Sequence, residues 1–284
     1  MLIENTGNLT YYEVLQRASS FLAEIGHSSF VSEWLIRERL GWDKTELVLN
    51  YQTQITDDKL EQFNRDLDAF FKGQPLQQII GHEWYYNRKF KVTKDTLIPR
   101  PETEEWQDRV LKSLPKTPLN VIDIGTGTGV LGITHKLERP EDTVTLTDIS
   151  KEALLVAKEN AKNLKADVAF KLGNLFEPVR GQHFDVVLCN PPYIGENEVD
   201  VMDQSVLEYE PKGALFAADE GLAIYKELAL SFSNYLKPEA KVFLEIGYKQ
   251  GVQVANIMQE HLPNAAVEIW QDFNHLDRVI TIHT

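Results

Sequence analysis

The sequence predicts an α/β protein in which a doubly wound, mainly parallel sheet with an antiparallel edge strand follows a small helical bundle and a β-hairpin. Three observations support this prediction. Apolar residues recur with helical spacing over 10–73, two β-prone runs follow at 84–92, and strand-like runs alternate with helical segments from Pro118 onwards. Alternation of strands and helices is typical of a parallel sheet that carries helices on both faces.

Candidate helices make up the first segment, because its apolar residues keep returning to one face. Three of these helices begin at residues that can cap a helix N-terminus, namely Thr10, Ser28 or Ser29, and Thr56, and a short third helix is expected from Asp43 to Leu49. Gly41 and Gly73 follow the second and fourth helices as natural stops. The segment shows no catalytic constellation. We therefore expect residues 1–80 to form a helical domain that docks the substrate or stabilises the fold.

A β-hairpin is predicted next, since Trp84-Tyr85-Tyr86 and Phe90-Lys91-Val92 flank a polar turn. We expect residues 81–96 to link the helical domain to a second domain over 97–284. The second domain begins with a helix that continues to about Leu114. Arg100 and Glu102 stand among prolines at the entry to this helix. They either form a rigid helix start or face a site.

The alternating part of the chain supplies the sheet. Strands are expected at 121–124, 144–148, 166–171, 184–189 and 240–246, with a closing pair at 267–270 and 278–282. The intervening helices are expected at 130–137, 150–162, 221–235 and 251–261. Ligands of such sheets bind at the carboxyl ends of the strands, near the switch in strand order. Glu245 stands at one such end, where it either lines a site or simply ends the strand.

A glycine turn, Gly125-Thr126-Gly127-Thr128-Gly129, joins the first strand of the sheet to its helix. Glycines allow a tight turn and a close approach of ligand to backbone. The dinucleotide fingerprint needs a sixth-position glycine, where this chain has Val130, so that fingerprint fails. Asp148 ends the next strand, where its carboxylate can accept hydrogen bonds from a ribose diol. NAD and S-adenosylmethionine both carry that diol, and the broken fingerprint favours S-adenosylmethionine.

The run Asn190-Pro191-Pro192-Tyr193 follows the buried strand at 184–189. Neither proline has an N–H to donate, so the chain must leave the sheet there, and it does so stiffly. The Asn190 side-chain oxygen and a proline carbonyl can accept both hydrogens of a flat –NH₂ group, while the Tyr193 ring packs on its face. Because Gly125, Asp148 and Asn190 all fall at carboxyl ends of strands, we expect them to converge.

Composition limits the functions that are possible. The 284 residues are 43% hydrophobic, enough for a large core, and the formal net charge of -14 opposes non-specific binding to nucleic acid. Cys189 is the only cysteine, so no intramolecular disulfide forms and a cytoplasmic location is expected. The first residues lack a signal-peptide pattern, and no apolar run is long enough for a membrane span. The seven histidines lack metal-ligand spacing, so we expect no metal.

Together these motifs resemble the release-factor glutamine methyltransferases (the PrmC/HemK family) among the S-adenosylmethionine-dependent methyltransferases. The resemblance covers nearly the whole chain and implies a Rossmann-like methyltransferase sheet. It rests on the runs Gln74-Pro75-Leu76-Gln77, Ile80-Gly81, Leu97-Ile98-Pro99-Arg100-Pro101-Glu102-Thr103-Glu104, Asp123-Ile124-Gly125-Thr126-Gly127-Thr128-Gly129, Asn190-Pro191-Pro192-Tyr193-Ile194 and Tyr209-Glu210-Pro211. This family methylates the side-chain amide nitrogen of the glutamine in the Gly-Gly-Gln motif of peptide chain release factors.

The resemblance implies a role for each site residue. The glycine turn, Asp148, Leu175 and Asn190 would hold S-adenosylmethionine. The catalytic group that also binds the glutamine amide would be Asn190, Pro191, Pro192 and Tyr193, with Arg100 and Glu102 as further substrate contacts. Two positions depart from the family pattern: Leu175 stands near where some relatives stack an aromatic ring on the adenine, and Glu208 replaces a familiar arginine. The expected partner is a release factor, with no direct nucleic-acid or membrane contact and a monomeric enzyme.

Two other functions fit some of these motifs. The exocyclic amine of adenine in DNA or RNA has the same flat pair of donors, so Asn190 to Tyr193 would suit it as well. That reaction requires a flipped base and a basic channel, which the acidic composition disfavours. A degenerate fold that only docks a protein partner is the other possibility, although such a module has no need for Gly125, Asp148 and Asn190 together.

Overall fold

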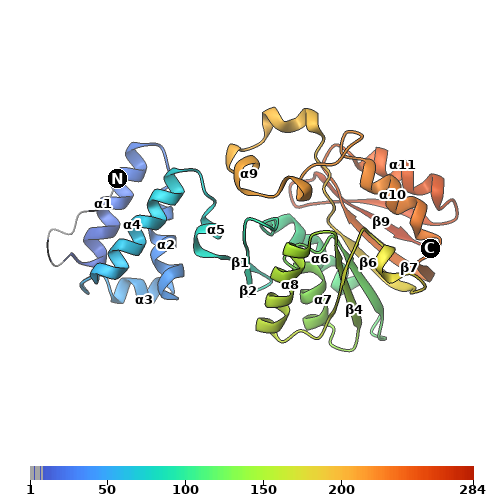
Figure 1. Cartoon of the computed structure of the whole chain (residues 1–284), viewed down its shortest axis with the longest axis horizontal. Helices are drawn as coiled ribbons and strands as arrows, with labels where there is room; N and C mark the ends of the chain where they lie inside the picture. Colours follow the sequence, from blue (N-terminus) through green and yellow to red (C-terminus); the bar gives the residue numbers. More distant parts are fainter. Residues whose placement is uncertain (1–2, 4–6, 8) are drawn as a thin grey trace. The chain divides into compact units, whose positions relative to one another are not determined.

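The computed structural model describes residues 3, 7 and 9–284, which form two compact units (Figure 1). The first unit is Met1–Gly81 and the second is His82–Thr284. The sequence-based division placed a separate linker at 81–96, whereas in the structure this hairpin belongs to the second unit. No helix within the described ranges is both long enough and apolar enough to cross a bilayer.

The first unit is helical throughout its described part. Its helices are α1 (Tyr11–Glu24), α2 (Phe30–Leu40), α3 (Lys44–Leu49), α4 (Asp57–Phe71) and α5 (Leu76–Ile80). Capping boxes at Thr10 and Asp43 confirm two predicted starts, because each side chain accepts a hydrogen bond from the backbone N–H three residues later. Gly41 has a left-handed φ of 67° and ends α2 as predicted. The helices enclose one apolar core around the fully buried Leu22 and Leu35.

The second unit is built on one sheet with the strand order β5-β4-β3-β6-β7-β9-β8. Its strands are β3 (Asn120–Ile124), β4 (Thr143–Asp148), β5 (Ala169–Leu172), β6 (Phe184–Cys189), β7 (Leu236–Glu245), β8 (Ala266–Gln271) and β9 (Asp277–His283). Neighbours from β5 to β7 are parallel, and β9 is antiparallel to both β7 and β8. The predicted doubly wound fold is confirmed. In detail, the reversed strand β9 lies one position in from the edge, between β7 and β8.

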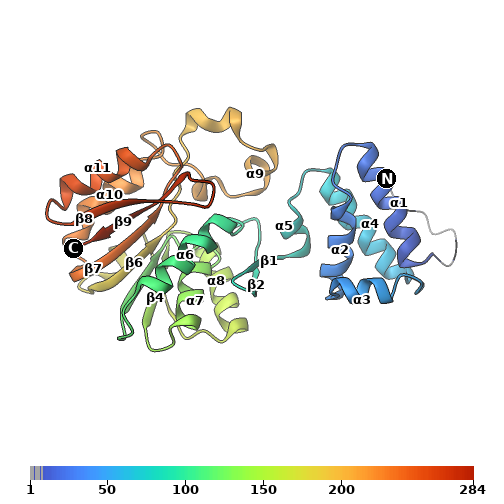
Figure 2. The same ribbon diagram turned by 180° about the vertical axis from the view of Figure 1, so that it is seen from behind.

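Helices cover both faces of this sheet (Figures 1 and 2). The helices α6 (Pro101–Ser113), α7 (Val130–Glu138) and α8 (Lys151–Leu164) cover one face, and α10 (Ala223–Phe232) and α11 (Gly251–His261) cover the other. Side chains alternate along β3 to match. Val121 packs in the core under α6 and α7, while Ile122 and Ile124 pack in the core under α10 and α11. Burial on both faces explains why Val186, Val187 and Leu188 on the central strand β6 are apolar in succession.

The hairpin of β1 (His82–Tyr85) and β2 (Arg88–Lys91) is anchored to the second unit at both strands. The Tyr85 hydroxyl donates to Gln107 Oε1 on α6 at 2.6 Å, and the Lys91 N–H donates to Asn160 Oδ1 on α8 at 2.7 Å. Tyr85 is 1% exposed and lies in the same apolar core as α6 and α7. The hairpin therefore helps to build the wall next to α6 and α8.

Several short elements lie outside the predicted set. These are α5, α9 (Gln204–Tyr209) and the 3₁₀ turns Glu177–Val179, Glu196–Val201 and Lys212–Ala214. None is longer than six residues, so none repeats an apolar position often enough to produce a periodic pattern. Strand β7 also begins at Leu236, four residues earlier than expected, because Phe184 on β6 pairs with Leu236 ahead of the regular ladder.

Candidate active site

A cavity of about 720 Å³ lies at the carboxyl ends of β3, β4 and β6. The strand register brings the predicted site together there. Ile124 on β3 pairs with Cys189 on β6 and with Thr147 on β4, so the residues that follow on the three strands are neighbours. Those residues are Gly125, Asn190 and Asp148. The cavity lies where strand order reverses around β3, the position at which such sheets bind ligands.

Most of the residues predicted for the site line this cavity. They are Arg100, Gly125, Thr126, Gly127, Thr128, Asp148, Leu175, Asn190, Pro191 and Pro192. Gly129, Tyr193 and Glu102 lie outside its lining. The lining also includes Leu97, Phe216 and Ala217, which the sequence interpretation did not assign to the site. Leu97 begins the run at 97–104 that the sequence analysis singles out, whereas no local pattern marks Phe216 and Ala217.

The glycine turn needs its glycines for conformational reasons. Gly125 and Gly127 have φ values of 68° and 54°, in the left-handed region that L-residues with side chains rarely adopt. Asp123 supports the turn from below, because its Oδ2 accepts from the Gly132 N–H at 2.9 Å and from the Thr126 hydroxyl. Burial raises the pKa of Asp123 to about 7. The turn is thereby held open towards the cavity by backbone geometry and by one buried carboxyl group.

Asp148 lines the cavity with its carboxylate already fixed in place. Its Oδ2 accepts from the Gly127 N–H and its Oδ1 from the Ser150 N–H, both at 2.8 Å. Burial raises the pKa of this carboxyl group above its ordinary value. Each carboxylate oxygen has more than one acceptor direction, so both can still accept a hydrogen bond from a diol in the cavity.

Asn190 continues from β6 into the cavity wall, and its side-chain amide is oriented by a neighbour. Its Nδ2 donates to Thr103 Oγ1 on α6 at 3.3 Å. The Thr103 hydroxyl donates in turn to Glu245 Oε2 at 2.6 Å. Glu245 is fully buried, and burial raises the pKa of its carboxyl group. The sequence left the role of Glu245 open, and the structure places it behind the cavity wall.

Tyr193 follows the two cavity-lining prolines but is not itself part of the lining. Its ring packs with the apolar side chains under α10 and α11, and burial raises the pKa of its hydroxyl. Its carbonyl oxygen accepts from Gln250 Nε2 at 2.8 Å. Gly221 passes so close that an added Cβ would collide with the same carbonyl oxygen. Tyr193 thus anchors the segment at 190–193 in which the chain leaves the sheet, called the diproline exit below.

A short strap holds the far end of that exit. The Ile194 N–H donates to the Leu215 carbonyl and the Ala217 N–H donates to the Ile194 carbonyl, both at 3.0 Å. These two bonds form an isolated parallel bridge between Ile194 and Phe216. Residues 195–214 therefore leave and return at one point, next to the cavity.

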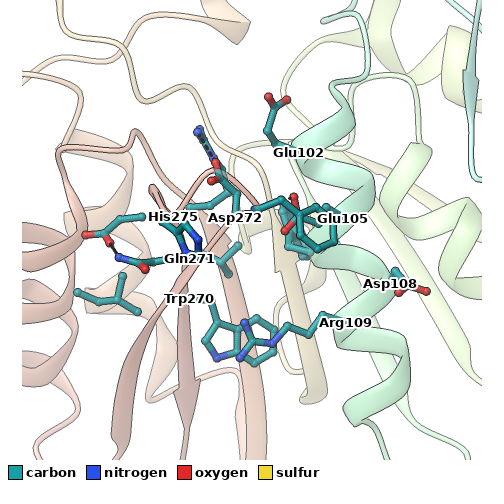
Figure 3. A pocket seen from close by; sticks show the side chains of 14 residues that line it. Glu102, Glu105, Asp108, Arg109, Trp270, Gln271, Asp272 and His275 are labelled. Atoms are coloured by element: carbon teal, nitrogen blue, oxygen red, sulfur yellow. Dashed lines mark hydrogen bonds and ion pairs between the residues drawn. The ribbon is translucent and has the colours of Figure 1, made fainter.

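Arg100 and Glu102 separate in the structure although they are close in sequence. Arg100 lines the cavity and forms an ion pair with Glu210, a residue that is 4% exposed and also accepts from the Ile98 N–H at 2.9 Å. Glu102 instead lines a second hollow of about 930 Å³ between α6 and the β8–β9 hairpin (Figure 3). In that hollow the Arg109 guanidinium lies 3.7 Å from the centre of the Trp270 ring.

Leu175 and Glu208, the two departures from the family pattern, also differ in position. Leu175 lines the cavity and has a φ of 43°, which is uncommon for a side chain of this size. It therefore offers an apolar contact where an aromatic ring would stack. Glu208 is exposed on α9, outside the cavity lining.

Comparison with known proteins agrees with this geometry. A family model described as methyltransferase small domain matches residues 108–239, and one described as PrmC N-terminal domain matches residues 13–81. Among solved structures, a methyltransferase from Pyrococcus furiosus superimposes with a TM-score of 0.52 at 14% identity, covering 77% of this chain and 98% of that chain. At this identity the likeness shows the fold alone.

Curated relatives are similar over almost the full chain. The release factor glutamine methyltransferase of Enterococcus faecalis is 42% identical over 269 residues, which cover 95% of this chain and 97% of the relative. The enzyme of the same name from Bacillus subtilis is 38% identical over 278 residues, with coverage of 95% and 96%. This chain therefore belongs to the family of the release factor glutamine methyltransferases.

Proposed function

We propose that this protein transfers a methyl group from S-adenosylmethionine to the side-chain amide nitrogen of the glutamine in the Gly-Gly-Gln motif of peptide chain release factors. The observation that carries the proposal is the register of β3 and β6, which sets the glycine turn beside Asn190 in one cavity. The curated relatives bear the name of this activity. The adenine-amine alternative has no comparable support among them.

The residues of the cavity fit S-adenosylmethionine, which supplies an electrophilic methyl group. Gly125 and Gly127 present backbone without side chains, and nothing lies within 4 Å of where a Cβ would project from either. Asp148 offers acceptors to the ribose diol, and Leu175 gives the adenine an apolar contact. The glycine turn, Asp148 and Leu175 are thus the proposed cofactor residues.

Asn190 and the diproline exit are the proposed amide site. An amide nitrogen is a poor nucleophile because its lone pair is delocalised into the carbonyl. Positive charge builds on this nitrogen as it bonds to the methyl carbon and as the bond between that carbon and the sulfur breaks. Asn190 Oδ1 and the Pro191 carbonyl oxygen then accept stronger hydrogen bonds from the nitrogen than they do before the reaction. The surplus proton leaves afterwards to water, so no general base is required. Pro192 and Tyr193 hold the exit rigid behind these acceptors.

The remaining assignments concern how the substrate is bound. Arg100 faces the cavity from its ion pair with Glu210 and would contact the glutamine loop, whereas Glu102 would contact the substrate farther out. The helical unit is the proposed docking domain for the release factor. We further propose a monomeric cytoplasmic enzyme without direct nucleic-acid or membrane contact.

A labelling experiment tests the proposed function. The protein is incubated with methyl-labelled S-adenosylmethionine and a purified release factor, in parallel with a release factor whose Gly-Gly-Gln glutamine is replaced by alanine, and with adenine-containing oligonucleotides. Label should enter the intact release factor alone. Label in the oligonucleotide, or equal label in the alanine variant, would contradict the proposal.

A further inference from the structure

Two buried side chains are connected to Asn190 in series, one of which, Thr103, also lines the cavity, while the other, Glu245, lies outside its lining. Thr103 on α6 is 2% exposed and Glu245 at the end of β7 is 1% exposed. Asn190 Nδ2 lies 3.3 Å from Thr103 Oγ1, which lies 2.6 Å from Glu245 Oε2. The indole Nε1 of Trp106 donates to the same carboxylate oxygen at 2.8 Å. The series therefore starts at a buried carboxylate and ends at the amide in the cavity wall.

The direction of each hydrogen bond in this series follows from the donors available. A carboxylate only accepts, and a hydroxyl has a single hydrogen. Since Thr103 gives its hydrogen to Glu245, it can only accept from Asn190. The amide of Asn190 must then turn Nδ2 towards Thr103 and Oδ1 towards the cavity. The opposite orientation would set Oδ1 against the lone pairs of Thr103 with no hydrogen between them.

We propose that Thr103 and Glu245 are positioning residues that fix the side-chain amide of Asn190 with its oxygen facing the substrate nitrogen. This inference rests on the proposed function, which makes Asn190 Oδ1 an acceptor for the glutamine amide. Burial of a carboxylate is costly unless it is hydrogen-bonded, and here Trp106 and Thr103 both donate to Oε2 of Glu245. The carboxylate in turn determines which way the Thr103 hydrogen points.

Substitutions at Thr103 test the inference. Thr103→Val keeps the shape but removes the hydroxyl, Thr103→Ala removes it without adding a methyl group, and Thr103→Ser keeps it. Without the hydroxyl, the productive orientation of Asn190 leaves a donor unsatisfied, so the turnover number should fall about 10- to 100-fold in Thr103→Val and Thr103→Ala. KM for the release factor and Kd for S-adenosylmethionine should change much less. Thr103→Ser should retain turnover within about 3-fold of wild type, because its hydroxyl makes the same two bonds.

A matched control separates this role from general packing. Thr134 on α7 is also fully buried on a helix, and its hydroxyl has no hydrogen-bond partner among the residues that the structure describes. Thr134→Val makes the same chemical change away from Asn190 and should leave turnover unchanged. Wild-type turnover in Thr103→Val and Thr103→Ala would overturn the inference. So would a loss in Thr103→Ser as large as in Thr103→Val.

A measurement without turnover keeps the inference apart from the proposed function. In protein labelled with ¹⁵N at asparagine, the Asn190 side-chain NH₂ signals are assigned by their loss in Asn190→Ala. Their hydrogen exchange should be slow in wild type and fast in Thr103→Val. Equal exchange in the two proteins would overturn the inference even if methyl transfer is observed. Slow exchange in wild type together with fast exchange in Thr103→Val would support the positioning role of Thr103 even if the substrate proves to be a different amide.

Discussion

Replacing Asp123 with asparagine should abolish one specific pH dependence of stability. Asp123 is fully buried below the glycine turn, where its Oδ2 accepts from Gly132 and Thr126 and its Oδ1 has no partner among the described residues. Burial raises the pKa of this carboxyl group from 3.8 to about 7. Asparagine keeps an acceptor at the Oδ2 position but cannot ionise.

The sign and size of the effect follow from proton linkage. Below about pH 4 the carboxyl group is protonated in both folded and unfolded states, and its contribution to stability is fully present. Between about pH 4 and 7 the folded state binds a proton that the unfolded state lacks, so the free energy of unfolding falls as pH rises. A pKa difference of roughly three is worth about 4 kcal/mol at most over this range. Above about pH 7 the loss is complete.

Denaturant unfolding of wild type and Asp123→Asn at several pH values between 4.5 and 8, about one pH step apart, measures this contribution. The wild-type free energy of unfolding, minus that of the variant, should fall steadily as pH rises. The helical unit and the carboxylates that do not interact with Asp123 contribute equally to both proteins and cancel, whereas the interaction of Asp123 with Asp148 is part of the measured difference. Asp167→Asn, which makes the same change on an exposed residue, should keep the wild-type pH dependence. A difference between wild type and Asp123→Asn that does not vary with pH would refute the reasoning.

Three further substitutions test the site. Asn190→Ala removes one acceptor and should lower turnover about 10²- to 10³-fold with unchanged calorimetric affinity for S-adenosylmethionine, and full activity would contradict its role. Asp148→Ala should weaken calorimetric binding of S-adenosylmethionine by about 1–3 kcal/mol, and unchanged affinity would count against the ribose assignment. Gly221→Ala places a Cβ against the Tyr193 carbonyl at a φ of 84°, so it should lower both the melting temperature and methyl transfer, and a variant with both unchanged would show that the exit is not clamped there.

The sequence was sufficient to predict the sheet and the meeting of three site residues at one of its edges. Gly125, Asp148 and Asn190 each follow a run of buried β-branched or aliphatic residues, and parallel strands present their carboxyl ends at one edge. Once strand order places β3 between β4 and β6, these positions must be neighbours. The positions of the strands follow from local periodicity, and their expected order follows from the general rules for doubly wound sheets.

Contacts that depend on packing between segments far apart in the chain could not be predicted from the sequence. Thr103 and Glu245 are 142 residues apart in the chain, and their hydrogen bond exists only because α6 packs over the end of β7. Tyr193 illustrates the opposite problem. An aromatic residue next to a site can face the ligand or the core, and the packing of the Tyr193 ring against the core under α10 and α11 depends on segments far away in the sequence. The sequence likewise predicts only a linker for the hairpin, because its hydrogen bonds to Gln107 and Asn160 depend on partners that its own residues do not identify.

The bridge between Ile194 and Phe216 allows most of the loop that it closes to vary without moving the residues at the reaction centre. Both ends of residues 195–214 are fastened at the Ile194–Phe216 bridge, and Glu210 is fixed to Arg100 and Ile98, so the part at 196–208 can lengthen, shorten or change composition while Asn190 and Pro191 stay in register with the glycine turn. A doubling of loop length costs only about 0.6 kcal/mol in closure entropy. The same reaction centre can therefore be adapted to differently shaped protein substrates by remodelling one tethered segment.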